Sequence, residues 1–267
     1  MGLHNKVATC LATNVGRVRT NNEDSLAEDR ELGLLVLADG MGGYNAGEVA
    51  SAIATTTVVE IVRRDWNGTE NPAEVANLLK SAVQTAHERI RARAAADPEC
   101  AGMGTTAIAC VLNRDQLAIA HVGDSRVYRW RQRALNQLTQ DHSLLEELIA
   151  RGHYTREDAN RLVRKNIVTR ALGVEEDISV DLIDDRLEIG DLLLLCSDGL
   201  TDMLDDSAIA VILGSPRVEL QSIARALIEA ALTAGGRDNV SVALARVDQI
   251  EGSGSWSGRL RKWWQAG

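Results

Sequence analysis

Four segments of the sequence place an aspartate close to a glycine at one end of an apolar run. The four residues are Asp39, Asp124, Asp198 and Asp238. Three of them follow the apolar run, whereas Asp238 precedes it. Withdrawing an unpaired carboxylate from water is costly, so these side chains either cap neighbouring helices or surround a cation. Because the same arrangement recurs along the chain, the pattern favours a cation.

The ligand types indicate a hard divalent cation. Mg²⁺ and Mn²⁺ prefer oxygen ligands and keep several waters, which suits carboxylates beside glycines that admit close backbone approach. Zinc is not indicated, because the sequence contains no His-x-x-x-His or Cys-x-x-Cys pair. His87 and His121 lie among apolar residues, and we interpret both as packed structural histidines.

The elements that must position these aspartates are short strands. We expect strands over residues 7–14, 34–38, 104–112, 116–122, 126–130, 178–183, 191–196 and 240–247. Several are joined by tight turns, which indicates antiparallel pairing. The long helices lie elsewhere in the chain, so the sequence predicts two sheets packed face to face with helices outside.

Three segments are expected to form these helices. The first covers residues 45–63 from a start that resembles a capping box, with Val49 and Ile53 turned inward. The second begins after an N-cap at Asn71 and continues as an apolar stripe for about twenty residues. The third covers residues 220–232.

Composition restricts the function classes. The 267 residues are 45% hydrophobic, which is ample for a core in one domain, and the net charge of −9 argues against electrostatic nucleic-acid binding. The four cysteines show no paired spacing, which indicates reduced thiols in a reducing compartment. No apolar signal core or run of membrane-spanning length occurs. We therefore expect a cytoplasmic monomer without a transmembrane segment.

The aspartate segments, together with Arg19–Asp24 and Gly102–Thr106, resemble the metal-dependent protein phosphatase family, PP2C or PPM, in its bacterial branch. The motifs occur in the family's order from about Arg17 to about Val247, which is most of the chain. One motif alone would be a weak signal, but six in order are specific. The resemblance implies an α+β fold, a four-layer α-β-β-α sandwich of two antiparallel sheets flanked by helices, with residues 1–250 as the phosphatase domain.

The resemblance also implies a set of ligands for two tightly bound Mn²⁺ or Mg²⁺ ions and a third, weaker one. Asp39 would bridge the two tight ions, with the carbonyl group of Gly40 on one ion and with Asp198 and Asp238 on the other. Asp124, together with Asp198, would hold the third ion.

Further residues gain roles from the same resemblance. Arg19 would bind the substrate phosphate, for which a guanidinium fork is well suited; from the residues alone, a charged surface turn is the alternative. Glu23 and Asp24 would hold waters bound to the ions, and Asn239 would lie with them just outside the ligand set.

The implied activity is hydrolysis of phosphoserine and phosphothreonine in proteins, by a hydroxide that bridges the two ions. Such an enzyme opposes a serine/threonine kinase, so phosphoproteins and a kinase are the expected partners. Two alternatives stay open: a metal-dependent hydrolase of small phosphate esters, and a non-catalytic binding module of the same fold. The presence of Asp39, Asp198 and Asp238 argues against the binding module.

Two segments are expected to stand apart from the catalytic core. Residues 141–173 correspond to the flap beside the active site, with helical stretches at 143–151 and 155–164. Bacterial relatives usually carry His-Pro where this chain has Leu162-Val163, and commonly a histidine at Tyr44. Residues 251–267 form a flexible linker and a short basic tail with tryptophans, which is either disordered or docks to an anionic membrane surface or a partner protein.

Nucleophilic catalysis by a side chain is not supported. Phosphatases that use cysteine carry an arginine six positions after it, and no cysteine of this chain does. Phosphatases that use aspartate carry a second aspartate two positions later, and no Asp-x-Asp pair occurs. Cys196 also ends an apolar strand and precedes Asp198 by two positions, and these surroundings raise a thiol's pKa.

We therefore predict that Cys196→Ser keeps most of the phosphatase activity, whereas chelation of divalent cations with EDTA removes all of it. Activity on para-nitrophenyl phosphate with Mn²⁺ and with EDTA measures both effects, and an acid quench during turnover should trap no phosphorylated enzyme. A folded but inactive serine variant, or a phosphorylated side chain, would contradict this mechanism.

Overall fold

The strand β3 (Leu34–Met41) shows how the sequence determines the layers. Successive side chains of a strand point to opposite faces of the sheet. Leu34 and Val36 belong to the core under the helices, whereas Leu35 and Leu37 belong to the core between the two sheets. Both faces of β3 are apolar, so the strand is stable only when it is covered on both sides.

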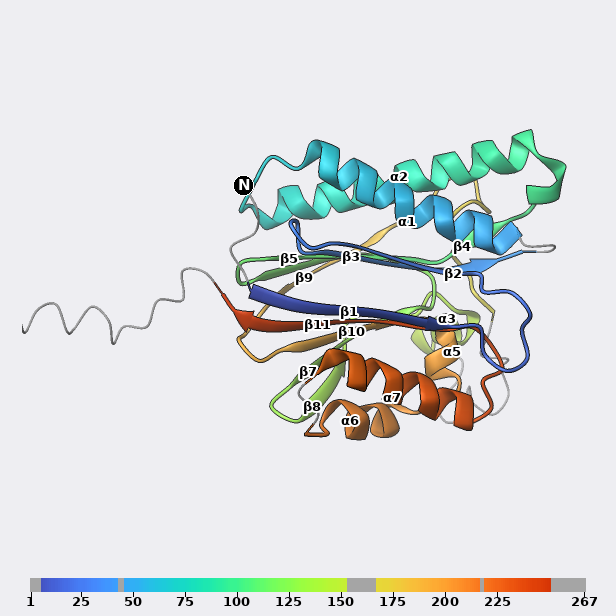
Figure 1. Cartoon of the computed structure of the whole chain (residues 1–267). Coiled ribbons are helices and arrows are strands. Elements are labelled where there is room, and N and C mark those ends of the chain that lie inside the picture. The colour runs from blue at the N-terminus through green and yellow to red at the C-terminus, as the bar shows by residue number, and fades with distance from the viewer. Residues whose placement is uncertain (1–5, 43–45, 153–166, 217–218, 251–267) are drawn as a thin grey trace, which may run out of the picture.

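The computed structural model describes residues 6–42, 46–152, 167–216 and 219–250. Within these residues, two antiparallel sheets lie face to face, and helices cover the outer face of each (Figure 1). The predicted four-layer α-β-β-α sandwich is therefore confirmed.

Each sheet draws its strands from distant parts of the sequence. The first sheet contains, in spatial order, β1 (Lys6–Asn14), β11 (Val240–Gln249), β10 (Leu192–Cys196), β7 (Arg126–Arg131) and β8 (Ala134–Gln137). The second contains β2 (Asp24–Asp29), β3, β5 (Ala107–Asn113), β6 (Gln116–Val122) and β9 (Asp181–Arg186), with the short β4 (Gly104–Thr105) paired to β3. The first and last of the described strands, β1 and β11, pair with each other in the first sheet.

The helices divide between the two outer faces. On the second sheet lie α1 (Ala46–Asp65) and α2 (Pro72–Ala96), the latter followed by the short η1 (Pro98–Cys100). On the first sheet lie α6 (Asp206–Leu213) and α7 (Leu220–Thr233). The short helices α3 (Leu144–Ala150) and α5 (Asp198–Thr201) lie at one end of the sandwich (Figure 1).

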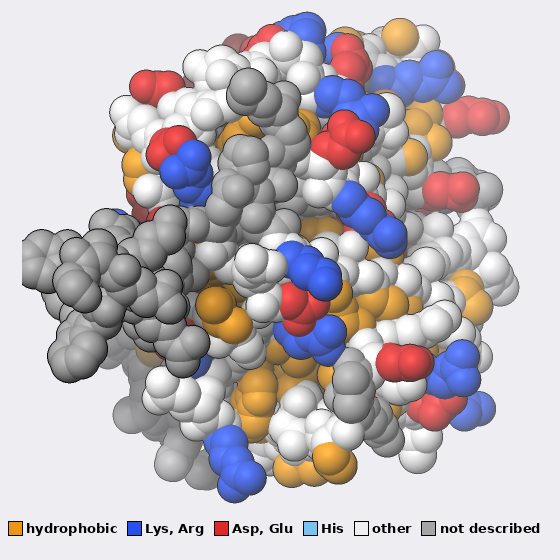
Figure 2. All heavy atoms as spheres, turned by 60° about the vertical axis from the view of Figure 1, so that its left-hand side comes forward, with side chains coloured by type: hydrophobic (Ala, Val, Ile, Leu, Met, Phe, Trp, Pro, Cys, Tyr) orange, Lys and Arg blue, Asp and Glu red, His pale blue; other side chains and the backbone are white. Residues whose placement is uncertain are grey.

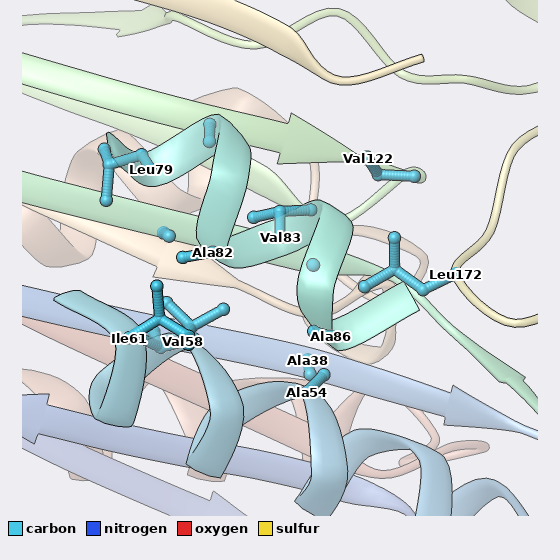
Figure 3. Close-up of a cluster of buried hydrophobic side chains, with 14 of the residues drawn as sticks. Ala38, Ala54, Val58, Ile61, Leu79, Ala82, Val83, Ala86, Val122 and Leu172 are labelled. Carbon is cyan, nitrogen blue, oxygen red and sulfur yellow. The ribbon is translucent and has the colours of Figure 1, made fainter. Parts of the chain in front are cut away.

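The core beneath α1 and α2 is built from small and branched residues. Figure 3 shows Ala54 of α1 beside Ala38 of β3, with Ala86 of α2 next to them and Val58 beside Ile61 further along α1. Alanines at these crossing points let helix and sheet approach closely.

The prediction for the inward face of α1 is only partly right. Val49 and Ile53 pack against the core from partly buried positions, whereas the fully buried face of α1 includes Ala50 and Ala54. The larger side chains lie at the edge of the contact, where there is room for them. The predicted cap at Asn45 lies outside the described residues.

Several predicted boundaries also shift. The strand expected at 178–183 is β9 at Asp181–Arg186, because pairing with β6 determines its position. Helix α2 has 25 residues and is longer than expected. The helix predicted at 143–151 is α3, at Leu144–Ala150. The helical stretch predicted at 155–164 lies outside the described residues.

The two ends of the sandwich differ. Figure 2 shows the end away from α5, where hydrophobic side chains gather among Lys or Arg and Asp or Glu side chains. The polar residues of interest lie at the opposite end, with α5 and β4 (Figure 1). In the part of the chain that the structure describes, no helix is both long enough and apolar enough to cross a membrane.

Candidate metal centre

The ends of five strands bring the predicted aspartates to one edge of the sandwich. Asp24 opens β2 and lies directly opposite Asp39 near the end of β3. In the other sheet, Asp198 follows β10 and Asp238 precedes β11, and these two strands pair side by side. Asp124 follows β6 in the second sheet. Antiparallel pairing therefore converts positions far apart in sequence into one carboxylate cluster.

The carboxylates raise one another's pKa. Partial burial, followed by the charges of Asp24 and Asp198, raises the pKa of Asp39 well above its ordinary value. Burial and then the charge of Asp124 do the same for Asp198. Burial raises the pKa of Asp124 to about 6, and the charge of Asp141 adds to the effect. Like charges gathered away from bulk water are unstable unless protons or cations compensate them.

The contacts of the Asp24 carboxylate show that these residues suit a hydrated cation. Its Oδ2 accepts a hydrogen bond of 2.9 Å from the Ser197 hydroxyl group, whereas its buried Oδ1 has no hydrogen-bond partner among the described residues. A buried carboxylate oxygen without a partner is costly, and water held by a cation supplies the missing donor. The donor set consists of oxygen atoms, as hard divalent cations require.

A glycine brings two of the carboxylates together. A Cβ atom at position 199 would lie 1.9 Å from the carbonyl oxygen of Asn239. No side chain fits there, so only glycine lets the start of α5 pack against the start of β11. This contact places Asp198 beside Asp238, whose charge contributes to the raised pKa of Asp198.

Asp238 is already engaged on both oxygens. Its Oδ2 lies 2.8 Å from Nη2 of Arg19, and its Oδ1 accepts from the backbone N–H group of Asn239 at 2.8 Å. The hydrogen bond to Asp238 raises the pKa of Arg19, and the charges of Glu23 and Asp198 contribute. Arg19 thus lies at the carboxylate cluster, with half of its side chain exposed.

The described part of the chain contains no three Asp, Glu, His or Cys side chains close enough to form a closed ligand set. The Arg19 contact turns the Asp238 carboxylate toward the guanidinium group. An open arrangement is compatible with Mg²⁺ or Mn²⁺, which bind through one or two carboxylates and keep several waters.

Asn239 forms hydrogen bonds to the backbone of the loop that carries Arg19. Its Oδ1 accepts from the backbone N–H group of Glu23 at 2.7 Å, and its Nδ2 donates to the carbonyl groups of Val15 and Asn21 at 3.0 and 2.8 Å. The amide therefore fastens the loop that carries Arg19 and Glu23 to the start of β11.

Sequence reasoning missed the hydroxyl groups that brace the cluster. The backbone N–H group of Asp39 donates to Thr106 Oγ1 at 2.9 Å, and this oxygen lies 2.8 Å from Ser125 Oγ. Ser197 joins Asp24 to the N–H group of Ser241. Small hydroxyl side chains at strand ends have no distinctive pattern, which is why the sequence alone does not identify them. Asp141 and His142 were also missed, although they follow β8 by a few residues.

A cavity of about 600 Å³ adjoins the cluster beside Asp124 and Asp198. Further acidic side chains line it, namely Asp141, Glu146, Asp202, Asp205 and Asp206, and one guanidinium group, that of Arg126. The negative potential of these walls favours cationic groups over anionic ones.

The surroundings of Cys196 do not suit a nucleophile. Its side chain is fully buried, and burial raises the pKa of the thiol to about 12. The thiolate, which is the reactive form, is therefore rare at neutral pH.

The comparison with known proteins agrees with this geometry. The sequence profile of the protein phosphatase 2C family matches residues 16–235. The chain belongs to this family. A Listeria monocytogenes protein named serine/threonine phosphatase stp is 39% identical over 242 residues, which cover 88% of this chain and 94% of that protein.

Solved structures of the family show the same fold. The Mycobacterium tuberculosis serine/threonine phosphatase PstP superimposes with a TM-score of 0.84 at 35% identity, covering 91% of this chain and 99% of that one. A structure of the PstP catalytic domain in complex with two manganese ions has a TM-score of 0.80 at 35% identity, with the same coverage.

The predicted site residues therefore lie at one edge of a protein phosphatase 2C fold. They are Arg19, Glu23, Asp24, Asp39, Gly40, Asp124, Asp198, Asp238 and Asn239. Three positions where the sequence departs from the family pattern, Tyr44, Leu162 and Val163, lie outside the described residues.

The raised pKa values predict how the metal-free protein responds to pH. A carboxyl group whose pKa is raised on folding binds more protons in the folded state, so stability falls as the pH rises through the window between the two values. For Asp124 this window runs from 3.8 to about 6, and for Asp39 it extends upward from the same ordinary value. In EDTA, the melting temperature should drop by several degrees between about pH 5 and pH 8.

Asp39→Asn should reduce this drop, and Mn²⁺ should reduce it in the wild-type protein. Asp205→Asn is the matched control, since the pKa of Asp205 is lowered, first by the Ser207 hydroxyl group, and asparagine preserves the helix cap. Thermal unfolding at several pH values measures the effect. If the melting temperature fell equally with pH in the wild type and in Asp39→Asn, mutual repulsion of the carboxylates would not be the cause of the pH dependence.

Proposed function

We propose that this chain hydrolyses phosphoserine and phosphothreonine in proteins, in a reaction that depends on divalent cations. The observation that carries the proposal is the gathering of Asp39, Asp198 and Asp238 with Arg19 at one edge of the sandwich. Membership of the protein phosphatase 2C family and relatives named serine/threonine phosphatases along nearly their whole length support it.

The ligand assignment extends this proposal. Asp39 and the carbonyl group of Gly40 would hold one ion, and Asp39, Asp198 and Asp238 the other, with Asp124 and Asp198 for a third, weaker ion. The PstP structure with two manganese ions supports Mn²⁺ for the tight pair. When bound, ions of this kind activate water and neutralise charge on a phosphate group.

The chain's own residues would bind the substrate and orient water. Arg19 offers five N–H donors, of which one bonds to Asp238 in the structure, so its fork can also accept a phosphate group. The unpartnered Oδ1 of Asp24 can accept a hydrogen bond from a water and hold it in a fixed direction. Burial raises the pKa of Glu23, which borders the same space.

The acidic cavity favours a protein substrate over a nucleotide. Its lining repels a second phosphate or other anionic group, whereas it tolerates the neutral or basic side chains that surround a phosphorylated residue in a protein. We extend the proposal to the expected partner, a serine/threonine kinase whose products this enzyme reverses. We also assign residues 1–250 to one phosphatase domain, apart from the tail at 251–267.

Removing a ligand should abolish turnover. We expect Asp39→Asn and Asp238→Asn each to lower kcat by at least about 100-fold at saturating Mn²⁺, because charge stabilisation by such ions contributes several kcal/mol. A phosphothreonine peptide and a nucleoside monophosphate serve as substrates, and circular dichroism checks the fold.

The matched control is Asp248→Asn, which removes an exposed carboxylate near the end of β11, and it should leave activity unchanged. If either ligand variant kept more than a few per cent of wild-type activity, the ligand assignment would be wrong. Hydrolysis of the nucleotide in preference to the peptide would favour the alternative, a small-ester hydrolase.

Arg19 gives an independent test of phosphate binding. Arg19→Ala should raise KM about tenfold, since a charged hydrogen bond contributes roughly 1.5–3 kcal/mol. Arg19→Lys should recover only part of this, because an ammonium group cannot make the bidentate contact. Steady-state kinetics on the phosphothreonine peptide measures both.

Arg17→Ala is the control for this test. Arg17 lies on the same loop, but its Nε donates to the carbonyl group of Leu232 at 2.8 Å, away from Asp238. Its removal should leave KM unchanged. An unchanged KM in Arg19→Ala, or an equal rise in Arg17→Ala, would show that Arg19 does not bind the phosphate and only belongs to a charged surface turn.

A further inference from the structure

Two consecutive residues, Asp141 and His142, hold the loop of Asp124 from both sides. Asp141 accepts a bidentate pair from Arg126, with its Oδ2 2.7 Å from Nη2 and its Oδ1 2.9 Å from Nε. His142 holds the preceding side of the loop through Gly123. The Asp124 carboxylate therefore lies between two fastened neighbours.

His142 contacts Gly123 through both its backbone and its ring. The backbone N–H group of His142 donates to the Gly123 carbonyl at 2.8 Å, and the N–H group of Gly123 donates to His142 Nδ1 at 3.0 Å. Gly123 has a φ of +110°, and a Cβ atom there would lie 2.5 Å from Cγ2 of Thr106. The turn before Asp124 is thus formed by a glycine that no other residue can replace, and it is held by one histidine.

The contacts determine the tautomer of His142. Since the Gly123 N–H group is a donor, Nδ1 must be unprotonated, and the ring proton of the neutral imidazole must lie on Nε2. This nitrogen lies 3.2 Å from Oδ2 of Asp181, which accepts its hydrogen bond, and 3.3 Å from Nη1 of Arg170, a donor that cannot bond to a protonated nitrogen. Arg170 donates to the other oxygen of Asp181 at 3.1 Å. Asp181 therefore selects the tautomer that lets His142 hold Gly123.

His142 and its neighbours also contact residues 167–170, which lie in the described C-terminal part of the segment 141–173. The N–H group of Thr169 donates to the carbonyl oxygen of His142 at 2.8 Å, and that of Leu144 donates to Ile167 at 2.9 Å. Ser143 and Val168 form an antiparallel bridge between these contacts.

We propose that His142 is a positioning residue for Asp124, and that it couples this carboxylate to residues 167–170. The inference rests on the proposed function, in which Asp124 holds the weaker third ion. His142 does not touch the reacting groups. It acts by fixing the backbone of Gly123, so that the Asp124 carboxylate is presented in one orientation before an ion binds.

Two substitutions of His142 distinguish the roles of its two ring nitrogens. His142→Asn places an amide oxygen near the position of Nδ1 and keeps an acceptor for Gly123. His142→Gln places its amide near Nε2 and removes that acceptor, which leaves a buried N–H group without a partner. A role in packing alone, for instance against His121 with ring centroids 4.8 Å apart, predicts no such difference in the function of the two variants.

The chain offers a matched control in His87. This buried histidine also accepts from a glycine N–H group through Nδ1, that of Gly173 at 3.1 Å, but it belongs to α2. His87→Gln should destabilise the protein in a comparable way while leaving the Gly123 amide and the Mn²⁺ dependence unchanged.

The experiment measures amide hydrogen exchange of Gly123 in the metal-free protein, Mn²⁺ binding by calorimetry, and kcat over a range of Mn²⁺ concentrations. For His142→Gln we expect Gly123 exchange to accelerate about tenfold or more, and the half-saturating Mn²⁺ concentration of the weak site to rise about tenfold. The two tight ions should bind as in the wild type, and excess Mn²⁺ should restore kcat. His142→Asn should stay close to wild type in all three readouts.

The inference is overturned if a folded His142→Gln protein retains both Gly123 protection and wild-type Mn²⁺ dependence, or if the asparagine variant behaves like the glutamine variant. Should the glutamine variant not fold, the ¹⁵N shifts of His142 in the wild-type protein decide, because a protonated Nδ1 excludes the proposed contact. A wild-type protein without phosphatase activity would refute the proposed function, but the Gly123 measurement in the metal-free protein would still stand.

Discussion

The mutual repulsion of carboxylates at one edge of the sandwich is the constraint on which the rest of this site depends. Asp24 and Asp39 lie directly opposite each other on paired strands, an arrangement that is unfavourable for like charges. A fold retains such a pair only if the strands are held by stronger forces elsewhere. Here the apolar faces of β3, buried against helices on one side and the first sheet on the other, supply them. Burial of this core thus offsets the repulsion between the carboxylates, and the edge remains able to bind cations.

Polar side chains around the cluster also hold the carboxylates in place. Hydrogen bonds from neighbouring groups fix the backbone that carries these carboxylates. Thr106 receives the N–H group of Asp39, and Asn239 fastens the Arg19 loop with three hydrogen bonds to backbone groups. Fixed ligands lose little conformational freedom when an ion or a substrate arrives, so more of the binding energy is available for affinity and for catalysis.

The sequence predicts the layers and the carboxylates well because both follow local rules. An apolar strand that ends in Asp-Gly, such as that before Asp39, is readable from neighbouring residues alone. The fully buried face of α1 and the boundaries of β9 depend on partners far away in sequence. The sequence therefore does not show that Val49 is only partly buried or that β9 begins at Asp181. Asp141 and His142 have no recognisable motif of their own. Their roles depend on contacts with Arg126 and Gly123 that only the folded chain creates.

The contact between Arg19 and Asp238 connects the two halves of the chemistry. The carboxylate group of Asp238 can be neutralised by the guanidinium group or by a cation, and the guanidinium group can pair with the carboxylate or with a phosphate group. Because the observed pair of 2.8 Å is half exposed on the arginine side, its net stabilisation is small. A cation that takes Asp238 would release Arg19 donors toward the substrate. Ion binding and phosphate binding would then favour each other, since each removes the competitor of the other.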